Sequence, residues 1–302
     1  MTASLPVHDQ YDDPDHRPGG ELPGGVHLDS TAQIMNRIST RLAGRLSLLA
    51  RDRTPRPTPP VLVLVAHGSR DPRALATVRT LAERIRELRP GLSVRLGHIE
   101  LDEPLLPDTL AALGEESAVL VPLLLSRGHH VKRDIPEAAA AVPARTRVAP
   151  PLGPHPLLVE TLHARLLEAG WHAGTSGAGR ARSAVVLAAA GSRDPDAALD
   201  TGRTAELLAD RLGVPVVPAY ASAAAPTVAD AVRSLNARGR HRVAVASYFT
   251  APGRFATECA RAAPGLAAAP LGAHPLMARL VLHRYDRTAA TAAGTERALS
   301  SA

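Results

Sequence analysis

The sequence predicts an α/β fold made of two tandem domains, each with a four-stranded parallel sheet flanked by helices. Three observations support this prediction. Short aliphatic runs alternate with helical patterns, GSRDP occurs at residues 68–72 and again at 191–195, and PLGPHPLL at 151–158 is matched by PLGAHPLM at 270–277. Two markers that recur in the same order at nearly the same separation are typical of a duplicated domain. The 302 residues suffice for two such domains, each with its own core.

Apolar runs predict four strands in the first copy, and the patterns between them predict helices. The strands are expected at 61–66, 93–99, 118–125 and 146–150, and the helices are expected to begin at Pro72, Pro104, Asp134 and Pro156. Alternation of strand and helix implies a parallel sheet, because a parallel crossover requires a helix and is right-handed.

The second copy repeats this pattern after a segment rich in Gly, Ser and Ala, as is typical of a linker. Its strands are expected at 184–189, 214–219, 242–249 and 266–269. The predicted organisation is a mostly disordered extension at 1–58, a first domain at 59–170, a linker at 171–182, a second domain at 183–287 and a disordered tail at 288–302.

Residues 1–58 are too polar and too rich in Pro and Gly to form a core. Within them, one amphipathic helix is predicted from apolar residues at helical spacing, namely Ile34, Ile38, Leu42, Leu46 and Leu49. Docking of this helix on its own domain, or partial disorder, is favoured over a membrane or targeting role.

Composition restricts the classes of function. The net charge is +6, but basic and acidic residues are interspersed and aromatic residues are only 2%, which argues against nucleic-acid binding. No apolar run is long enough for a membrane span, so a soluble, cytoplasmic protein is expected. The single cysteine, Cys259, excludes an internal disulfide and any CxxC motif.

Histidines and a carboxylate follow the predicted strands of the first copy. His67 comes directly after the first strand, His98 and Glu100 lie at the end of the second, and His129 and His130 follow the third. Because the carboxyl ends of parallel strands meet at one edge of a sheet, these side chains are expected to converge there. Imidazoles and a carboxylate suit a borderline divalent metal such as Fe²⁺, Co²⁺, Ni²⁺ or Zn²⁺.

Each of these residues also has a purely structural interpretation. A histidine at a strand end is often hydrogen-bonded within the fold, and Glu100 is a possible helix cap. The duplication provides an internal comparison, because the second copy has Ala190 and Ser222 at the positions of His67 and Glu100. Arg254 falls at the position of His130, in a register that the sequence leaves ambiguous. Loss of all three with retention of GSRDP indicates a chemical role.

Four segments of the first copy resemble the sirohydrochlorin chelatases, the small class II chelatases of siroheme and cobalamin biosynthesis. They are HGSRDPRA, the glutamate of IELDEP, VPLLLSRGHHVKRDIP and PLGPHPLL, within residues 61–168. The second half resembles the degenerate partner domain of the long, two-domain members. The resemblance implies two chelatase-type domains and insertion of Fe²⁺ or Co²⁺ into sirohydrochlorin between them, with no permanently bound cofactor.

The resemblance also implies roles for particular residues. The catalytic and metal-binding residues become His67, Glu100 and His130, although the doublet with His129 permits a shift of one residue. Counting back from Asp134 favours His130.

The substrate so implied carries eight carboxylates, which arginines and backbone N–H groups would bind. Arg127, and the turn at Ser69, are expected to do so, and Arg193 and Arg254 would contribute to the opposite wall. An ion pair with the aspartate of GSRDP is the favoured interpretation of Arg70 and Arg193.

The expected partners are sirohydrochlorin and a divalent metal, with no nucleic acid and a monomeric chain. Two other functions stay open: a carrier of metal or tetrapyrrole without turnover, and a hydrolase that uses a metal-activated water or Ser69 with His67 as base. The sequence does not decide between iron, cobalt and nickel.

Overall fold

Four aliphatic runs of the first repeat form one parallel sheet. In the computed structural model, which describes residues 35, 38–42, 58–142, 145–174 and 176–300, these strands are β1 (Val61–Ala66), β2 (Val94–His98), β3 (Ala118–Pro122) and β4 (Thr146–Val148). Their order in the sheet is β2-β1-β3-β4, and all neighbours are parallel. All six residues of β1 are buried, as expected for a central strand that is covered on both faces.

The second repeat builds the same sheet from β5 (Ser183–Ala189), β6 (Val216–Tyr220), β7 (Arg242–Ser247) and β8 (Leu266–Ala267). Its order, β6-β5-β7-β8, reproduces that of the first sheet. The predicted fold class of two tandem α/β repeats is therefore confirmed. Most strands end one to three residues earlier than predicted, because the apolar pattern continues into buried loops that follow them.

Helices follow the strands in both repeats. The first repeat has α2 (Pro72–Leu88), α3 (Leu106–Ala111), α4 (Ile135–Ala140) and α5 (Pro156–Glu168), and the second has α7 (Pro195–Leu212), α8 (Val228–Ala237), α9 (Arg254–Arg261) and α10 (Pro275–Ser300). The predicted linker contains a short helix, α6 (Gly177–Ala181). A π-helical turn, η1 (His130–Asp134), precedes α4, so the third helical segment begins earlier than the predicted Asp134.

The repeated GSRDP motif is a turn that starts a helix. Asp71 is the N-cap of α2 and accepts a hydrogen bond from the backbone N–H of Arg73 at 3.0 Å, and Asp194 caps α7 in the same way. These carboxylates point into the first helical turn, so the expected ion pairs with Arg70 and Arg193 are not formed. Asp71 instead binds the side chain of Arg73.

The repeated PLGxHPL motif also starts a helix. His155 and His274 are the residues before α5 and α10, and their Nδ1 atoms accept hydrogen bonds from the N–H groups of Leu157 and Leu276 at 3.1 and 3.2 Å. Both duplicated markers are therefore explained by helix initiation.

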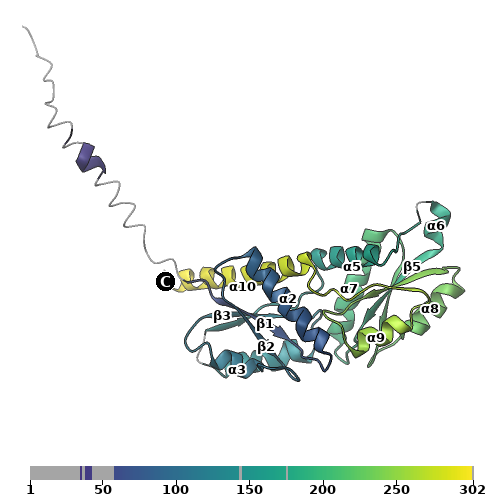
Figure 1. Ribbon diagram of the computed structural model, residues 1–302, viewed down its shortest axis with the longest axis horizontal. Helices are drawn as coiled ribbons and strands as arrows, with labels where there is room; N and C mark the ends of the chain where they lie inside the picture. Colours follow the sequence, from purple (N-terminus) through teal and green to yellow (C-terminus); the bar gives the residue numbers. More distant parts are fainter. Residues whose placement is uncertain (1–34, 36–37, 43–57, 143–144, 175, 301–302) are drawn as a thin grey trace, which may run out of the picture. The chain divides into compact units, whose positions relative to one another are not determined.

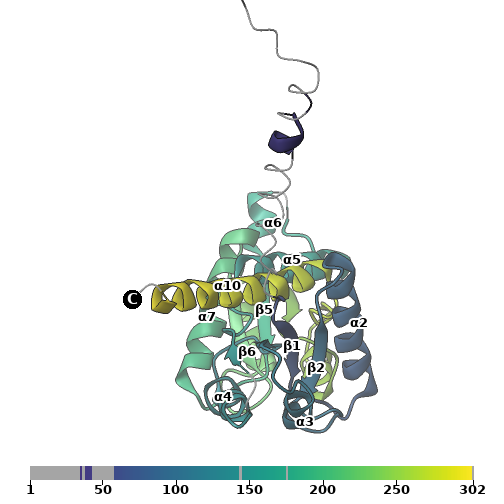
Figure 2. The same ribbon diagram turned by 90° about the vertical axis from the view of Figure 1, so that its left-hand side faces the viewer.

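The two repeats exchange their last helices. Helix α5 of the first repeat packs on α7 and β7 of the second, whereas α10 of the second packs on α2 and β3 of the first (Figures 1 and 2). The inner faces of both sheets consequently share one hydrophobic core, while each outer face has a core of its own. Residues Pro59–Ala302 therefore form one compact unit that contains both repeats.

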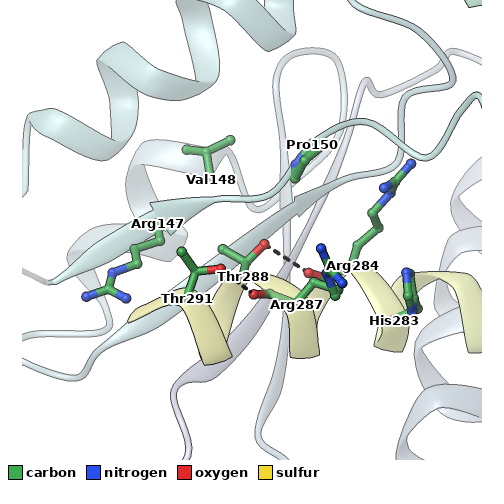
Figure 3. Close-up of a pocket in the computed structure, with 8 residues that line it drawn as sticks. All are labelled: Arg147, Val148, Pro150, His283, Arg284, Arg287, Thr288 and Thr291. Atoms are coloured by element: carbon green, nitrogen blue, oxygen red, sulfur yellow. Dashed lines mark hydrogen bonds between the residues drawn. The ribbon is translucent and has the colours of Figure 1, made fainter. Parts of the chain in front are cut away.

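Helix α10 lies beside β4, where it borders a groove (Figure 3). Arg284 donates to the carbonyl of Leu152 at 3.1 Å, and the hydroxyls of Thr288 and Thr291 donate to carbonyls of the preceding helical turn. The helix continues to Ser300, which differs from the disordered tail expected from 288, because the alanine-rich segment favours a helix and contains no proline.

Residues Met1–Thr58 form a separate unit. The predicted amphipathic helix lies largely outside the described residues, and the described stretch at 38–42 is helical with exposed side chains. None of the helices in the described part of the chain combines the length and the hydrophobicity that a membrane span requires.

Candidate active site

The candidate site lies at the carboxyl edge of the first sheet. His67 follows β1, Glu100 follows β2, and His130 begins η1 after β3. The backbone N–H of Glu100 donates to the carbonyl of His67 at 3.0 Å, which fixes the two loops against each other. A cleft of about 890 Å³ opens here, and residues of both repeats line it.

His67 lies within reach of both Glu100 and His130. His67 Nδ1 lies 3.5 Å from Glu100 Oε1, and the rings of His67 and His130 lie edge to face with centroids 4.7 Å apart. The side chains of His67 and Glu100 are 45% and 54% exposed, so they are open to a molecule in the cleft.

Asp134 orients His130. Its Oδ2 atom lies 2.5 Å from His130 Nδ1, so the carboxylate fixes the imidazole tautomer and leaves Nε2 with the free lone pair. The neighbouring His129 is 76% exposed, and its ring centroid is 6.3 Å from that of His130. Of the two adjacent histidines, it is the His130 ring that lies against the His67 ring.

The site is not a preformed metal cage. Over the residues that the structure describes, no three His, Cys, Asp or Glu side chains are grouped so that they could hold a metal ion as they stand. The close pair of His67 and Glu100, and the exposure of both, mean that binding a cation requires rotation of these side chains. Such a site suits an ion that must later be released, because loose ligation leaves the ion labile.

His98, which the sequence places at the same edge, is a structural residue. It is 1% exposed, and its Nδ1 atom lies 3.1 Å from the carbonyl oxygen of Pro104. Its Nε2 atom is buried without a hydrogen-bond partner.

Ser69 lines the cleft, but its polar groups already have partners. Its N–H donates to Asp102 Oδ2 at 2.9 Å, and its Oγ accepts from the N–H of Asp71 at 3.1 Å. The N–H that was expected to bind an anion is therefore bonded to a carboxylate of the protein. This partner belongs to a loop after β2, which the local sequence of the turn does not indicate.

Arg127 bridges the two repeats. Its guanidinium binds the buried carboxylate of Asp200 on α7 at 2.7 Å, and its backbone N–H donates to the same carboxylate at 2.8 Å. Asp200 and Asp196 raise the pKa of Arg127, the first mainly through hydrogen bonding. Arg127 was expected to bind substrate, but its bonds to Asp200 indicate that it holds the two repeats together.

Two further residues, Lys132 and Tyr248, tie the repeats together. Lys132 of η1 pairs with Asp194 and Asp196 at 2.7 and 2.9 Å. The buried Tyr248, which follows β7, donates its hydroxyl to the carbonyl of Leu125 at 3.0 Å.

The third strands settle which residue of the second repeat corresponds to His130. Val65 pairs with Pro122, and the equivalent residue Ala188 pairs with Ser247. Counting forward from these partners, Gly128 corresponds to Gly253, and a helical segment follows each glycine. His129 therefore corresponds to Arg254, and His130 corresponds to Phe255. The expected match of His130 with Arg254 is wrong by one residue, because the connection between the second and third strands differs in length between the repeats.

The other two correspondences hold. Ser222 N–H donates to the carbonyl of Ala190 at 3.0 Å, which is the bond that Glu100 makes with His67. The second repeat consequently keeps the backbone of the site and has a methyl, a hydroxyl and a phenyl group where the first has two imidazoles and a carboxylate.

The wall of the cleft that the second repeat contributes is aromatic and basic. The chain contains two phenylalanines, Phe249 and Phe255, and both line the cleft together with Arg254 and Arg261. The guanidinium of Arg254 lies over the Phe255 ring, 4.7 Å from its centroid. From the first repeat, Arg70 lines the same cleft and is exposed. The sequence missed Phe255, since only the strand register shows its equivalence to His130.

Comparison with known proteins gives a consistent result. The CbiX family model matches twice, over residues 61–169 and 184–288, which are the two repeats. The sirohydrochlorin cobaltochelatase of Methanococcus aeolicus is 40% identical over 79 residues, which cover 25% of this chain and 55% of that protein. This chain thus spans little more than half the length of that relative.

Two comparisons cover both repeats. The sirohydrochlorin ferrochelatase of Bacillus subtilis is 26% identical over 250 residues, which cover 77% of this chain and 93% of that protein. The solved structure of SirB from Bacillus subtilis with Fe³⁺ matches 78% of this chain and 97% of its own, with a TM-score of 0.64 and 25% identity.

Proposed function

The chain belongs to the CbiX family, and from this premise we propose that it is a sirohydrochlorin chelatase that inserts Fe²⁺ or Co²⁺ into the tetrapyrrole. One observation carries the proposal: His67 and Glu100 lie side by side in the lining of a cleft that both repeats form, and His130 lies against His67. The relatives named for this reaction on cobalt and on iron support it.

Metal insertion makes three chemical demands. The ion must lose its waters, two pyrrole N–H protons must leave, and the macrocycle must present its nitrogen lone pairs to the ion. Neutral imidazoles bind a borderline cation through exchangeable bonds, which meets the first demand. We assign this role to His67 and to Nε2 of His130, which Asp134 keeps available for ligation.

Glu100 is placed to complete the ligation or to accept a pyrrole proton. Its carboxylate is half-exposed at the cleft and lies 3.5 Å from His67 Nδ1. It can therefore contact both a metal ion held by His67 and a molecule in the cleft. A carboxylate that takes up the proton as the ion passes to the ring removes the positive charge that would otherwise accumulate there.

Arginines at the rim account for binding of the carboxylates. Arg70 is exposed at the cleft because the aspartate of GSRDP is occupied by Arg73. Arg254 and Arg261 extend from the opposite wall. These residues take the place of Arg127, whose guanidinium is engaged by Asp200.

The reaction itself is the test. Purified protein is mixed with sirohydrochlorin and Co²⁺ or Fe²⁺, and insertion is followed by the change in tetrapyrrole absorption. We expect several equivalents of product per chain, whereas a carrier would stop at one. His67→Ala should reduce the rate at least a hundredfold and leave the fold intact, since Ala190 occupies the same turn in the second repeat. A normal rate in this variant would refute the site.

We further propose that the chain acts as a monomer in the cytoplasm. The second repeat closes the cleft within the same chain, so a second copy is not needed to complete it.

A further inference from the structure

We propose that the second repeat binds the face of the macrocycle, through Phe255 flanked by Arg254 and Arg261, while the first repeat holds the metal. We call these three residues the ring-binding wall. The inference rests on the proposed function, because the ligand that it assigns to the wall is the tetrapyrrole substrate.

The position of Phe255 is the first argument. The strand register makes it the counterpart of His130, because each is the second residue after the equivalent glycine, Gly253 or Gly128. Phe255 lines the cleft together with His67 and Glu100, and its counterpart His130 lies against His67. The position thus carries a metal-binding type of side chain in one repeat and a flat hydrocarbon in the other.

The scarcity of aromatic residues is the second argument. The chain has two phenylalanines, and both line this one cleft. Phe255 is half-buried, so part of its ring faces the cleft, whereas Phe249 packs partly against the outer core of the second sheet. A conjugated ligand that stacks on Phe255 would remove this face from water and gain the contact energy of two flat π systems.

The charges around the ring are the third argument. The Arg254 guanidinium lies 4.7 Å from the Phe255 centroid, and Arg254 and Arg261 are seven residues apart on α9, so they share one helical face. The nearest carboxylate to Arg254 is that of Glu258 at 3.8 Å, beyond hydrogen-bond distance, and the Arg254 side chain is 76% exposed. An aromatic surface bordered by cations fits a ligand with a flat conjugated centre and a rim of carboxylates.

A division of labour follows from this chemistry. A phenyl ring does not ligate Fe²⁺ or Co²⁺, so the second repeat leaves the cation to the imidazoles of the first. If both walls carried imidazoles, a cation on the ring-binding side would compete with the productive one. The asymmetry of the two repeats therefore fixes which face of the macrocycle receives the metal.

Two binding experiments on the full chain separate the halves of the site. Metal-free sirohydrochlorin is titrated by its absorption and fluorescence, and Co²⁺ alone is titrated by calorimetry. Phe255→Leu should weaken tetrapyrrole binding and raise KM about tenfold, which corresponds to about 1.4 kcal/mol of lost interaction, with kcat changed less than threefold. Its Co²⁺ affinity should equal that of the wild type. His67→Ala should show the reverse pattern, with Co²⁺ binding lost and tetrapyrrole binding kept.

Further variants act as controls. Phe255→Tyr keeps a flat ring and should bind the tetrapyrrole within twofold of the wild type. Arg254→Gln should weaken tetrapyrrole binding several-fold, whereas Arg203→Gln removes the same charge from an exposed site on α7 and should leave it unchanged. Circular dichroism and thermal unfolding establish that each variant is folded.

The outcomes distinguish this inference from the proposed function. If the wild type inserts metal and Phe255→Leu keeps its tetrapyrrole affinity and KM within twofold, the ring-binding wall is refuted and the chelatase stands. If the wild type binds the tetrapyrrole in a Phe255-dependent manner but never inserts metal, the wall stands and the chelatase fails.

Discussion

Gly68 and Gly191 allow the same backbone change to be made beside the catalytic residues and at their inert counterparts. Gly68 has φ +98°, and a Cβ atom there would lie 1.7 Å from the carbonyl oxygen of Glu100. Gly191 has φ +89°, and a Cβ atom there would lie 1.8 Å from the carbonyl oxygen of Ser222. An alanine needs about 3.5 Å from that oxygen, so the loop after β2 must move by about 1.5 to 2 Å. The left-handed backbone adds about 1 to 2 kcal/mol and the broken loop hydrogen bond about 1 kcal/mol.

Each variant should consequently lose about 3 kcal/mol of unfolding free energy, or about 6 to 12 °C in Tm for a unit of this size. Only Gly68→Ala moves Glu100, and a displacement above 1 Å should lower kcat about a hundredfold. Thermal unfolding and the insertion assay, run below both transition temperatures, measure the two effects. Equal losses of activity in Gly68→Ala and Gly191→Ala would refute the assignment of chemistry to the first repeat, and a wild-type Tm in either would refute the steric argument.

Two further predictions concern stability. Tyr248→Phe removes the buried hydroxyl that donates to Leu125 across the repeats, and chemical denaturation should show a loss of about 1 to 2 kcal/mol; a loss below about 0.5 kcal/mol would contradict this role for the bond. Burial, with the charges of Arg284 and His283, lowers the pKa of His155 from 6.5 to about 4. Between pH 4 and pH 6.5 the unfolded chain binds a proton at this histidine that the folded chain does not. The stabilising contribution of neutral His155 to the free energy of unfolding is therefore complete above pH 6.5 and is lost as the pH falls toward 4. The loss is on the order of 2 kcal/mol after allowance for partial exposure. His155→Asn keeps a helix-capping oxygen and should remove that part of the acid sensitivity; an unchanged pH dependence of stability would show that the proton is taken up elsewhere.

The parts of the fold that the sequence predicts well are those with local causes. The buried run of β1, the prolines that start α2, α5 and α10, and the two repeated motifs all act over a few residues, so pattern alone locates them. The meeting of His67, Glu100 and His130 is also predictable, because a parallel sheet brings the ends of its strands to one edge.

The missed features depend on contacts between the repeats. Nothing near Arg127 indicates that Asp200, seventy-three residues later, occupies its guanidinium. The exchange of α5 and α10 is likewise invisible, since an amphipathic helix shows that it has a partner but not which sheet provides it. For the same reason the sequence assigns Arg127 to substrate and pairs Arg70 with Asp71, whereas in the structure Asp200 binds Arg127 and Asp71 binds Arg73.

These contacts also bear on how the cleft works. Arg127 with Asp200, Lys132 with Asp194, and Tyr248 with Leu125 each join the two repeats, and the exchanged helices join them again through the shared core. Separating the repeats would expose that core to water and leave the Asp200 carboxylate without its cation. Both changes cost free energy, so they oppose a hinge opening between the repeats. The two walls are therefore held at a set distance before any ligand arrives. Exposed side chains such as those of His67, Glu100 and Arg254 can still rotate, but a planar ligand has to enter a gap whose width the fold has already fixed.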